Sequence, residues 1–278
     1  MSTFARNTMI IKKLTKQLFL LINLLILGLA SQSAYASDLA KEKRWSEQVV
    51  DSLMTGDAVW LEDGKTKFLG LYADSATAKT QGALIVVHGI GVHPNWPDVV
   101  LPIRSEFPEH SWATLSIQMP ILENEKTSVD YVPLFKEVNG RFDAAVKFLK
   151  SKNIQNIVIV AHSLGTTMSN HYLTTKPSPM VRGYVSISSS NNPDYDELHN
   201  VKKLSMIKSI PVLDIYGDQD LDSVLEYAKQ RKLAGKKANK NYKQIMLKGA
   251  DHFYQTTSAL LIKHIRLWLQ KNAPGQKI

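Results

Sequence analysis

The chain contains an apolar run and a small-residue turn at Ile157-Val158-Ile159-Val160-Ala161-His162-Ser163-Leu164-Gly165. Four consecutive aliphatic residues are typical of a strand buried on both faces, as in a parallel sheet covered by helices. The residues after Ser163 have a helix-like pattern, so the chain must turn sharply from strand to helix at this serine. Such a turn accepts only small residues two positions before and after its centre, where the chain has Ala161 and Gly165. The stretch therefore predicts a strand–turn–helix unit from which the Ser163 side chain projects.

That unit has the character of a nucleophile elbow, whose usual pattern is G-x-S-x-G. Ala161 departs from the pattern by one methyl group. The turn also directs the N-terminus of the new helix at the reaction site, where the Leu164 N–H and the helix dipole stabilise an oxyanion. We therefore expect Ser163 to be a nucleophile and Leu164 to supply one N–H of an oxyanion hole.

A serine nucleophile needs a histidine base and an acid that orients the base, and one known chain order is Ser, acid, His. The apolar segment 210–217 reads as a buried strand, and the acidic segment Asp218–Asp222 follows it at once. A further strand is predicted at 242–247, and His252 comes a few residues later. Because the carboxyl ends of parallel strands lie along one edge of a sheet, we expect these groups to converge on Ser163.

With these features the chain resembles the α/β-hydrolase superfamily over roughly residues 57 to 271, and it is also similar to exported bacterial families of this fold with no assigned substrate. The resemblance implies an α/β fold with a mostly parallel central sheet, helices on both faces and no large cap domain. It further implies that Ser163 is the nucleophile, His252 the general base and then acid, and Asp220 the orienting acid.

The choice of the acid leaves alternatives open. Gly217 stands three residues before Asp220, as in the family's pattern for the strand that carries the acid. Asp218 is the main rival. Asp222 and Asp194, which follows the preceding strand, are further candidates.

The first half of the chain contains a second loop of interest after a continuous apolar strand at 83–87. The loop reads His88-Gly89-Ile90-Gly91 and precedes the elbow by about 75 residues. It resembles the oxyanion loop of the family, in which the residue after His-Gly donates its backbone N–H. The resemblance assigns that N–H to Ile90, with Gly89 and Gly91 allowing close approach of the backbone to a substrate. His88 is interpreted as a supporting residue that bonds loop backbone.

Residues 1–36 have the layout of a secretory signal peptide. They contain four basic and no acidic residues, an apolar stretch at 18–30, and the triplet Ala34-Tyr35-Ala36. The alternative is a membrane anchor, but the apolar stretch is shorter than the roughly 20 residues that span a bilayer. We expect cleavage after Ala36 and export to the periplasm or the extracellular space.

The composition limits the remaining interpretations. The 278 residues, 44% of them hydrophobic, suffice for one sizeable domain, which we place at 57–278 after a helical lead-in at 37–56. The absence of cysteine excludes disulfides, a cysteine nucleophile and thiolate metal sites. No phosphate loop, zinc signature or nucleic-acid motif is present, so no cofactor, metal or nucleic-acid partner is implied.

The order of predicted elements fits this fold. Strands are expected at 59–62, 67–72, 83–87, 112–117, 157–160, 184–188, 210–217 and 242–247, with helices at 132–150, after Ser163 and at 256–270. The first two strands form an antiparallel pair. Alternation of strands and helices in the rest of the chain predicts a mostly parallel sheet covered on both sides.

The net charge of +9 falls to +5 once residues 1–36 are removed. The densest basic region comprises Lys229, Arg231, Lys232, Lys236, Lys237, Lys240 and Lys243. We interpret it as a solvated helix face and loop, with weak attraction to an anionic surface of the cell envelope as the alternative.

The substrate is expected to be a small molecule with an acyl bond. Its pocket should be lined by loops 92–102, 118–131 and 189–199, at the carboxyl ends of the strands. The polar run Ser188–Asn192 suggests hydrogen bonding to a polar group, and the short connection 188–211 suggests an open site for small or flexible esters.

The expected activity is ester hydrolysis through a covalent acyl-enzyme. A non-catalytic binding protein on the same fold is one alternative, because fold does not determine function. An acyltransferase or peptidase with the same triad is another.

Overall fold

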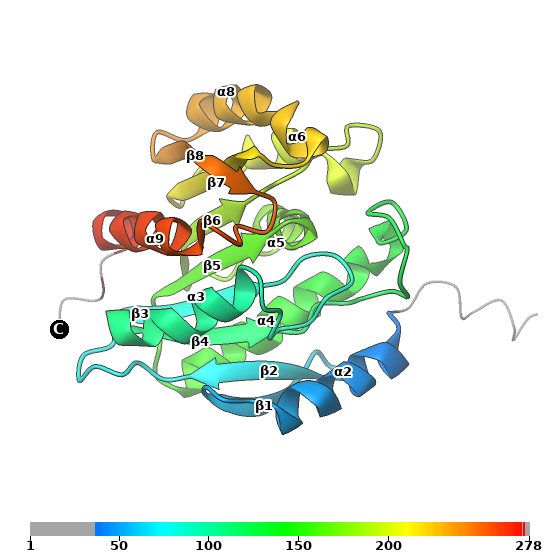
Figure 1. Ribbon diagram of the computed structural model, residues 1–278, viewed down its shortest axis with the longest axis vertical. Coiled ribbons are helices and arrows are strands. Elements are labelled where there is room, and N and C mark those ends of the chain that lie inside the picture. Colours follow the sequence, from blue (N-terminus) through cyan, green and yellow to red (C-terminus); the bar gives the residue numbers. More distant parts are fainter. Residues whose placement is uncertain (1–36, 274, 276–278) are drawn as a thin grey trace, which may run out of the picture. The chain divides into compact units, whose positions relative to one another are not determined.

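The computed structural model describes residues 37–273 and 275, which belong to one compact unit; the predicted signal peptide at 1–36 lies outside the described residues. The centre of the unit is an eight-stranded sheet with the order β1-β2-β4-β3-β5-β6-β7-β8 (Figure 1). Its strands are β1 Asp57–Glu62, β2 Lys67–Ala73, β3 Gly82–Val87, β4 Trp112–Ile117, β5 Ile157–His162, β6 Val181–Ile187, β7 Val212–Gln219 and β8 Tyr242–Asp251. β2 runs antiparallel to its two neighbours, β1 and β4. The other six strands, in the order β4-β3-β5-β6-β7-β8, all run parallel to one another. The predicted fold class is confirmed.

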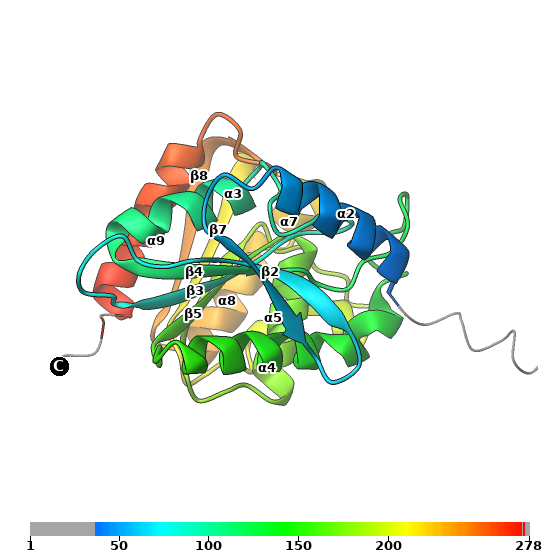
Figure 2. The same ribbon diagram turned by 90° about the horizontal axis from the view of Figure 1, so that it is seen from below.

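The inner strands β3, β4 and β5 have no exposed residue, which agrees with their unbroken apolar runs. Helices therefore cover both faces of the sheet, as the second view shows (Figure 2). The helices are α2 Leu39–Asp51, α3 Val100–Glu106, α4 Phe135–Ser151, α5 Leu164–Thr175, α6 Asn200–Leu204, α7 Asp222–Leu225, α8 Ala228–Ala238 and α9 Ser258–Asn272, with short 3₁₀ turns at Phe107–His110, Val132–Leu134 and Asp196–Leu198. Side chains of α4, α5 and α6 join one core cluster, and those of α3 and α9 join the cluster on the opposite face.

The N-terminal helix α2 is an integral part of this unit. Val49 of α2 packs on Leu69 and Leu71 of β2. Glu42 accepts two hydrogen bonds, of 3.0 and 3.1 Å, from the guanidinium of Arg141, a fully buried residue of α4. The same guanidinium donates to the Gln118 carbonyl at 3.0 Å. Because a buried guanidinium needs such partners, the lead-in segment completes the core at this end of the sheet.

One basic residue lies elsewhere than the sequence interpretation placed it. Arg231 was grouped with surface lysines, but its side chain is fully buried and pairs with Asp214 of β7 at 3.1 Å. Tyr242 and Gln244 also donate hydrogen bonds to the Asp214 carboxylate, at 2.7 and 2.9 Å. This ion pair attaches α8 to the sheet. A charge run in the sequence does not show which of its members turns inward.

No helix in the described part of the chain is long and apolar enough to cross a membrane.

Candidate active site

Ser163 occupies the turn that the sequence predicted. β5 ends at His162, α5 begins at Leu164, and Ser163 between them has φ 55° and ψ −126°. A positive φ is strained for a serine and is maintained only by the surrounding structure. Gly165 contributes to that constraint, because a Cβ at this position would lie 2.4 Å from the His88 carbonyl oxygen. The elbow is thus packed directly against the loop that follows β3.

Ser163, His252 and Asp220 form a continuous chain of hydrogen bonds. The Ser163 hydroxyl donates to Nε2 of His252 at 3.0 Å, and Nδ1–H of His252 donates to Oδ1 of Asp220 at 2.6 Å. The three residues lie at or just beyond the carboxyl ends of β5, β8 and β7. Gly217 permits the last two strand ends to approach each other, since a Cβ there would lie 2.0 Å from the Ala250 carbonyl oxygen.

The other acidic residues considered from sequence do not contact His252. Asp218 accepts a hydrogen bond from the Gly249 N–H at 2.6 Å and so joins the end of β7 to β8. Asp222 is exposed in the first turn of α7, and Asp194 is exposed in the loop after β6. Asp220 is therefore the carboxylate that is placed to orient the His252 ring.

Asp220 has two further side-chain neighbours that sequence reasoning missed. The Ser188 hydroxyl donates to Oδ2 of Asp220 at 2.5 Å, and the Tyr254 hydroxyl lies 3.0 Å from Ser188 Oγ. Burial alone would raise the pKa of Asp220, but the hydrogen bonds from His252 and Ser188 outweigh it and hold the pKa below its ordinary value. The charged form of the acid is thus stabilised. The available signal was the position of Ser188 at the end of β6, one strand away from Asp220.

The loop after β3 lies against Ser163. A Cβ on Gly89 would be 3.1 Å from Ser163 Cβ and 3.6 Å from Ser163 Oγ, so the Gly89–Ile90 peptide adjoins the reacting atom. His88 holds this loop: its Nδ1–H donates to the Gly89 carbonyl at 2.8 Å, while Nε2 accepts from the Met119 N–H at 2.9 Å. Complete burial lowers the pKa of His88 to about 3, so the ring is neutral. His88 thus joins the loop after β3 to the backbone that follows β4.

A second buried histidine, His162, contacts both the ring and the backbone of His252. Its Nε2–H donates to the His252 carbonyl oxygen at 2.8 Å, and the two ring centroids are 4.9 Å apart. Burial, followed by the proximity of His252, lowers the pKa of His162 to about 3. The neutral ring therefore fixes the backbone of the loop that carries His252. Sequence reasoning overlooked it because it treated position 162 of the elbow as unconstrained.

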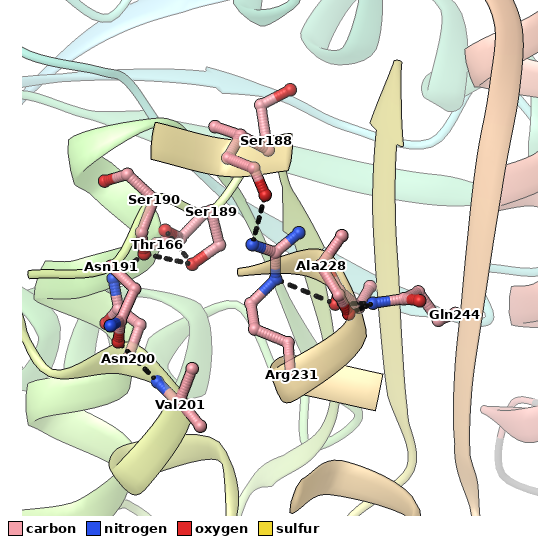
Figure 3. Close-up of polar contacts among 12 residues, drawn as sticks. Thr166, Ser188, Ser189, Ser190, Asn191, Asn200, Val201, Ala228, Arg231 and Gln244 are labelled. Atoms are coloured by element: carbon pink, nitrogen blue, oxygen red, sulfur yellow. Dashed lines mark hydrogen bonds and ion pairs between the residues drawn. The ribbon is translucent and has the colours of Figure 1, made fainter. Parts of the chain in front are cut away.

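The polar run Ser188–Asn192 was predicted to hydrogen-bond a ligand, but several of its side chains bond other residues of the protein (Figure 3). Ser188 is used by Asp220, Ser189 Oγ accepts from Thr166 Oγ1 at 3.0 Å, and Asn191 Oδ1 accepts from the Val201 N–H at 2.9 Å. These three side chains are buried. The run therefore serves mainly to attach the loop after β6 to α5 and α6, because buried polar groups require internal partners.

His252 and Asp220 are buried, and exposed apolar side chains lie next to them in the sequence. Ser163 is half-buried, whereas His252 and Asp220 are buried. Phe253 and Leu221, which directly follow the base and the acid, are 43% and 51% exposed. Within residues 37–273, no group of three or more His, Cys, Asp or Glu side chains could hold a metal ion. A serine that is hydrogen-bonded to a histidine, which a carboxylate holds in turn, is an arrangement that can support nucleophilic acyl transfer.

The fold is the α/β-hydrolase fold, which this chain shares with solved structures of esterases and a dienelactone hydrolase. The chain belongs to the family described as protein of unknown function (DUF3530), whose profile matches residues 19–132 and 133–271. No curated protein sequence matched the chain.

Solved structures with the same fold include several esterases. Est1E from Butyrivibrio proteoclasticus aligns with a TM-score of 0.60 at 15% identity, covering 77% of this chain and 98% of its own; a complex of Est1E with ferulic acid also matches. The Pyrococcus furiosus esterase Pf2001 aligns with a TM-score of 0.63 at 15% identity, covering 78% of this chain and 92% of its own. Dienelactone hydrolase from Anabaena variabilis aligns at 0.60 and 18% identity, covering 78% and 97%. At these identities the similarity establishes the shared fold.

Proposed function

We propose that this protein is an exported serine hydrolase that cleaves carboxylic esters through a covalent acyl-enzyme. The observation that carries the proposal is the unbroken hydrogen-bond chain from Ser163 through His252 to Asp220, mounted on a strained turn. Strain of this kind is retained where a rigid surrounding structure serves a function. A protein that only bound ligands would need neither the strain nor the aligned base.

The proposed reaction has two steps. As the Ser163 oxygen attacks the ester carbonyl, His252 Nε2 takes the hydroxyl proton, and the Ile90 and Leu164 N–H groups stabilise the oxyanion. His252 then donates that proton to the leaving alcohol, and the acyl group remains on Ser163. Water loses a proton to His252 and attacks the acyl carbonyl, after which the proton returns to Ser163 and the acid is released.

The surroundings of the triad favour an ester of modest size over a long buried acyl chain. The exposed rings and methyl groups of Phe253 and Leu221 offer apolar contact beside the base. The ring centroids of Phe253 and His252 are 5.2 Å apart in an edge-to-face arrangement, so the Phe253 ring packs against the imidazole of His252. The names of the similar structures, two esterases and a dienelactone hydrolase, support the same bond class.

The experiment that tests the nucleophile is covalent labelling with a fluorophosphonate, read by intact mass and peptide mapping. We expect one adduct, located on Ser163, and none on Ser163→Ala. Labelling at another residue, or no labelling of well-folded protein, would contradict the proposal. Export is tested separately by the N-terminal residue of the mature protein, expected to be Ser37.

A matched pair of variants tests the acid. Asp220→Asn should reduce the labelling rate by about 10⁴-fold, because it loses the charge that orients and stabilises the histidine. Asp218→Asn has the same change of charge two residues away, but Asp218 bonds the backbone N–H of Gly249 in β8 and not His252. It should retain labelling within a few-fold, and hydrolysis of aryl esters by the two variants should follow the same order.

A further inference from the structure

The helix α8 and the turn after it carry five exposed lysines, here called the cationic face: Lys229, Lys232, Lys236, Lys237 and Lys240. No aspartate or glutamate occurs between Glu226 and Asp251. None of the five lysines belongs to an ion pair within the described part of the chain. The face lies at the β8 end of the sheet, away from α2 and β1 (Figure 1).

The charge at the start of α8 opposes the stability of the helix, whereas Lys236 and Lys237 in the last turn are favourably placed for the helix dipole. Lys232 and Lys236 are four residues apart in α8, and like charges at this spacing on a helix repel. Lys229 lies in the first turn, where the helix dipole disfavours a cation, and no acidic residue accompanies it there. The inward side of α8 is anchored independently by the buried pair of Arg231 with Asp214. The fold therefore does not require the lysines, and an anionic partner would relieve their repulsion.

An apolar side chain stands among these charges. Leu233 is 63% exposed and lies one helical turn from Lys229, Lys236 and Lys237. On the adjacent strand β8, Met246 is 54% exposed on the same side as Gln244, which bonds the Ala228 carbonyl of α8. Lysines surrounding a protruding aliphatic residue suit a bilayer surface, where the charges meet lipid phosphates and the aliphatic tip enters the boundary of headgroups and acyl chains.

We propose that the cationic face binds the surface of an anionic phospholipid membrane, with Leu233 inserted at its centre. Nucleic acid is a weaker fit, because bidentate phosphate recognition relies on arginine and the arginine of α8 is buried. The proposal does not depend on the hydrolase activity. Membrane binding would hold the protein next to lipids or to products released at the envelope.

The test is co-sedimentation of the folded protein with vesicles of phosphatidylcholine alone, or of phosphatidylcholine mixed with phosphatidylglycerol. The protein should bind the anionic vesicles selectively, and binding should weaken at high salt. The triple variant Lys232→Gln/Lys236→Gln/Lys237→Gln should bind about a hundredfold more weakly, since each lysine at an anionic surface contributes about fivefold.

Matched controls separate a specific face from overall charge. The triple variant Lys65→Gln/Lys147→Gln/Lys150→Gln removes the same charge from exposed positions elsewhere and should lose at most a few-fold. Leu233→Ser changes no charge and should weaken binding several-fold. Ser163→Ala should bind as the parent does, and the α8 triple variant should hydrolyse soluble esters normally.

Three results would overturn the proposal. They are no preference of the parent for anionic vesicles, equal losses in the two lysine variants, or binding of heparin and duplex DNA without binding of vesicles. Unchanged binding of Leu233→Ser would overturn the insertion of that side chain. Thermal unfolding of each variant shows whether a loss of binding reflects loss of the fold.

Discussion

Gly165→Ala is expected to damage the active site more than the fold. The new methyl carbon would lie 2.4 Å from the His88 carbonyl oxygen and 2.9 Å from that of Val87. The first distance must widen by about 0.6 Å to reach even the 3.0 Å below which such contacts are essentially never found. Overpacking of a close-packed core costs about 1–3 kcal/mol. Alanine recovers about 1 kcal/mol of helix propensity, so the net destabilisation should be about 0–2 kcal/mol.

The same displacement acts directly on the chemistry. The elbow and the loop carrying Ile90 are the two elements in contact, so separating them moves Ser163 away from one N–H donor. A misplacement of about 1 Å costs about 100-fold in rate, and loss of one oxyanion donor costs a similar factor. We expect the rate of fluorophosphonate labelling of Gly165→Ala to fall by about 10- to 100-fold. This rate is measured by quenching the labelling reaction at timed intervals and determining the labelled fraction by intact mass.

Ala161→Gly is the matched control, because it restores the usual glycine at the other small position of the elbow. Ala161 is 1% exposed, so the variant loses one buried methyl group, about 0.8 kcal/mol, and gains backbone freedom, about 0.5–1 kcal/mol. Its destabilisation should therefore be no smaller than that of Gly165→Ala, at about 1–2 kcal/mol, but its labelling rate should stay within about twofold. Equal labelling rates in the two variants would refute the argued contact between elbow and oxyanion loop.

Two further outcomes follow from the groups behind the triad. Ser188→Ala should lower the labelling rate about tenfold, because Asp220 loses a hydrogen bond worth about 1.5–3 kcal/mol; an unchanged rate would show that Asp220 is held without the Ser188 hydroxyl. The depressed pKa of His162, about 3 against about 6.5 in the unfolded chain, means that only the unfolded state binds a proton between these values. The free energy of unfolding should therefore fall as the pH falls below about 6.5, by about 2 kcal/mol for this histidine at pH 5. Urea unfolding at pH 7 and pH 5 should show a smaller loss of stability for His162→Gln than for the parent. An equal loss in parent and variant would contradict the assignment.

Much of the architecture could be predicted because it depends on local patterns. Continuous aliphatic runs identified the buried strands, and small residues around Ser163 identified the turn. The boundaries were less accurate at strand ends. β8 continues to Asp251 although its apolar pattern ends near Leu247, because pairing with β7 resumes between Gln219 and Asp251 after an irregularity at Gly217. Backbone pairing of this kind leaves no trace in side-chain type.

The sequence alone predicted that a serine, an acidic segment and a histidine lie at the ends of three parallel strands. Only the tertiary structure decided which carboxylate of the acidic segment faces His252, because Asp218 and Asp220 differ in direction and not in chemistry. It also decided that Ser188 serves Asp220 and that Arg231 turns inward while its lysine neighbours remain in solvent. The physical reason is the same in each case: a residue's type limits the contacts it can make, but its partners come from segments that only folding brings together.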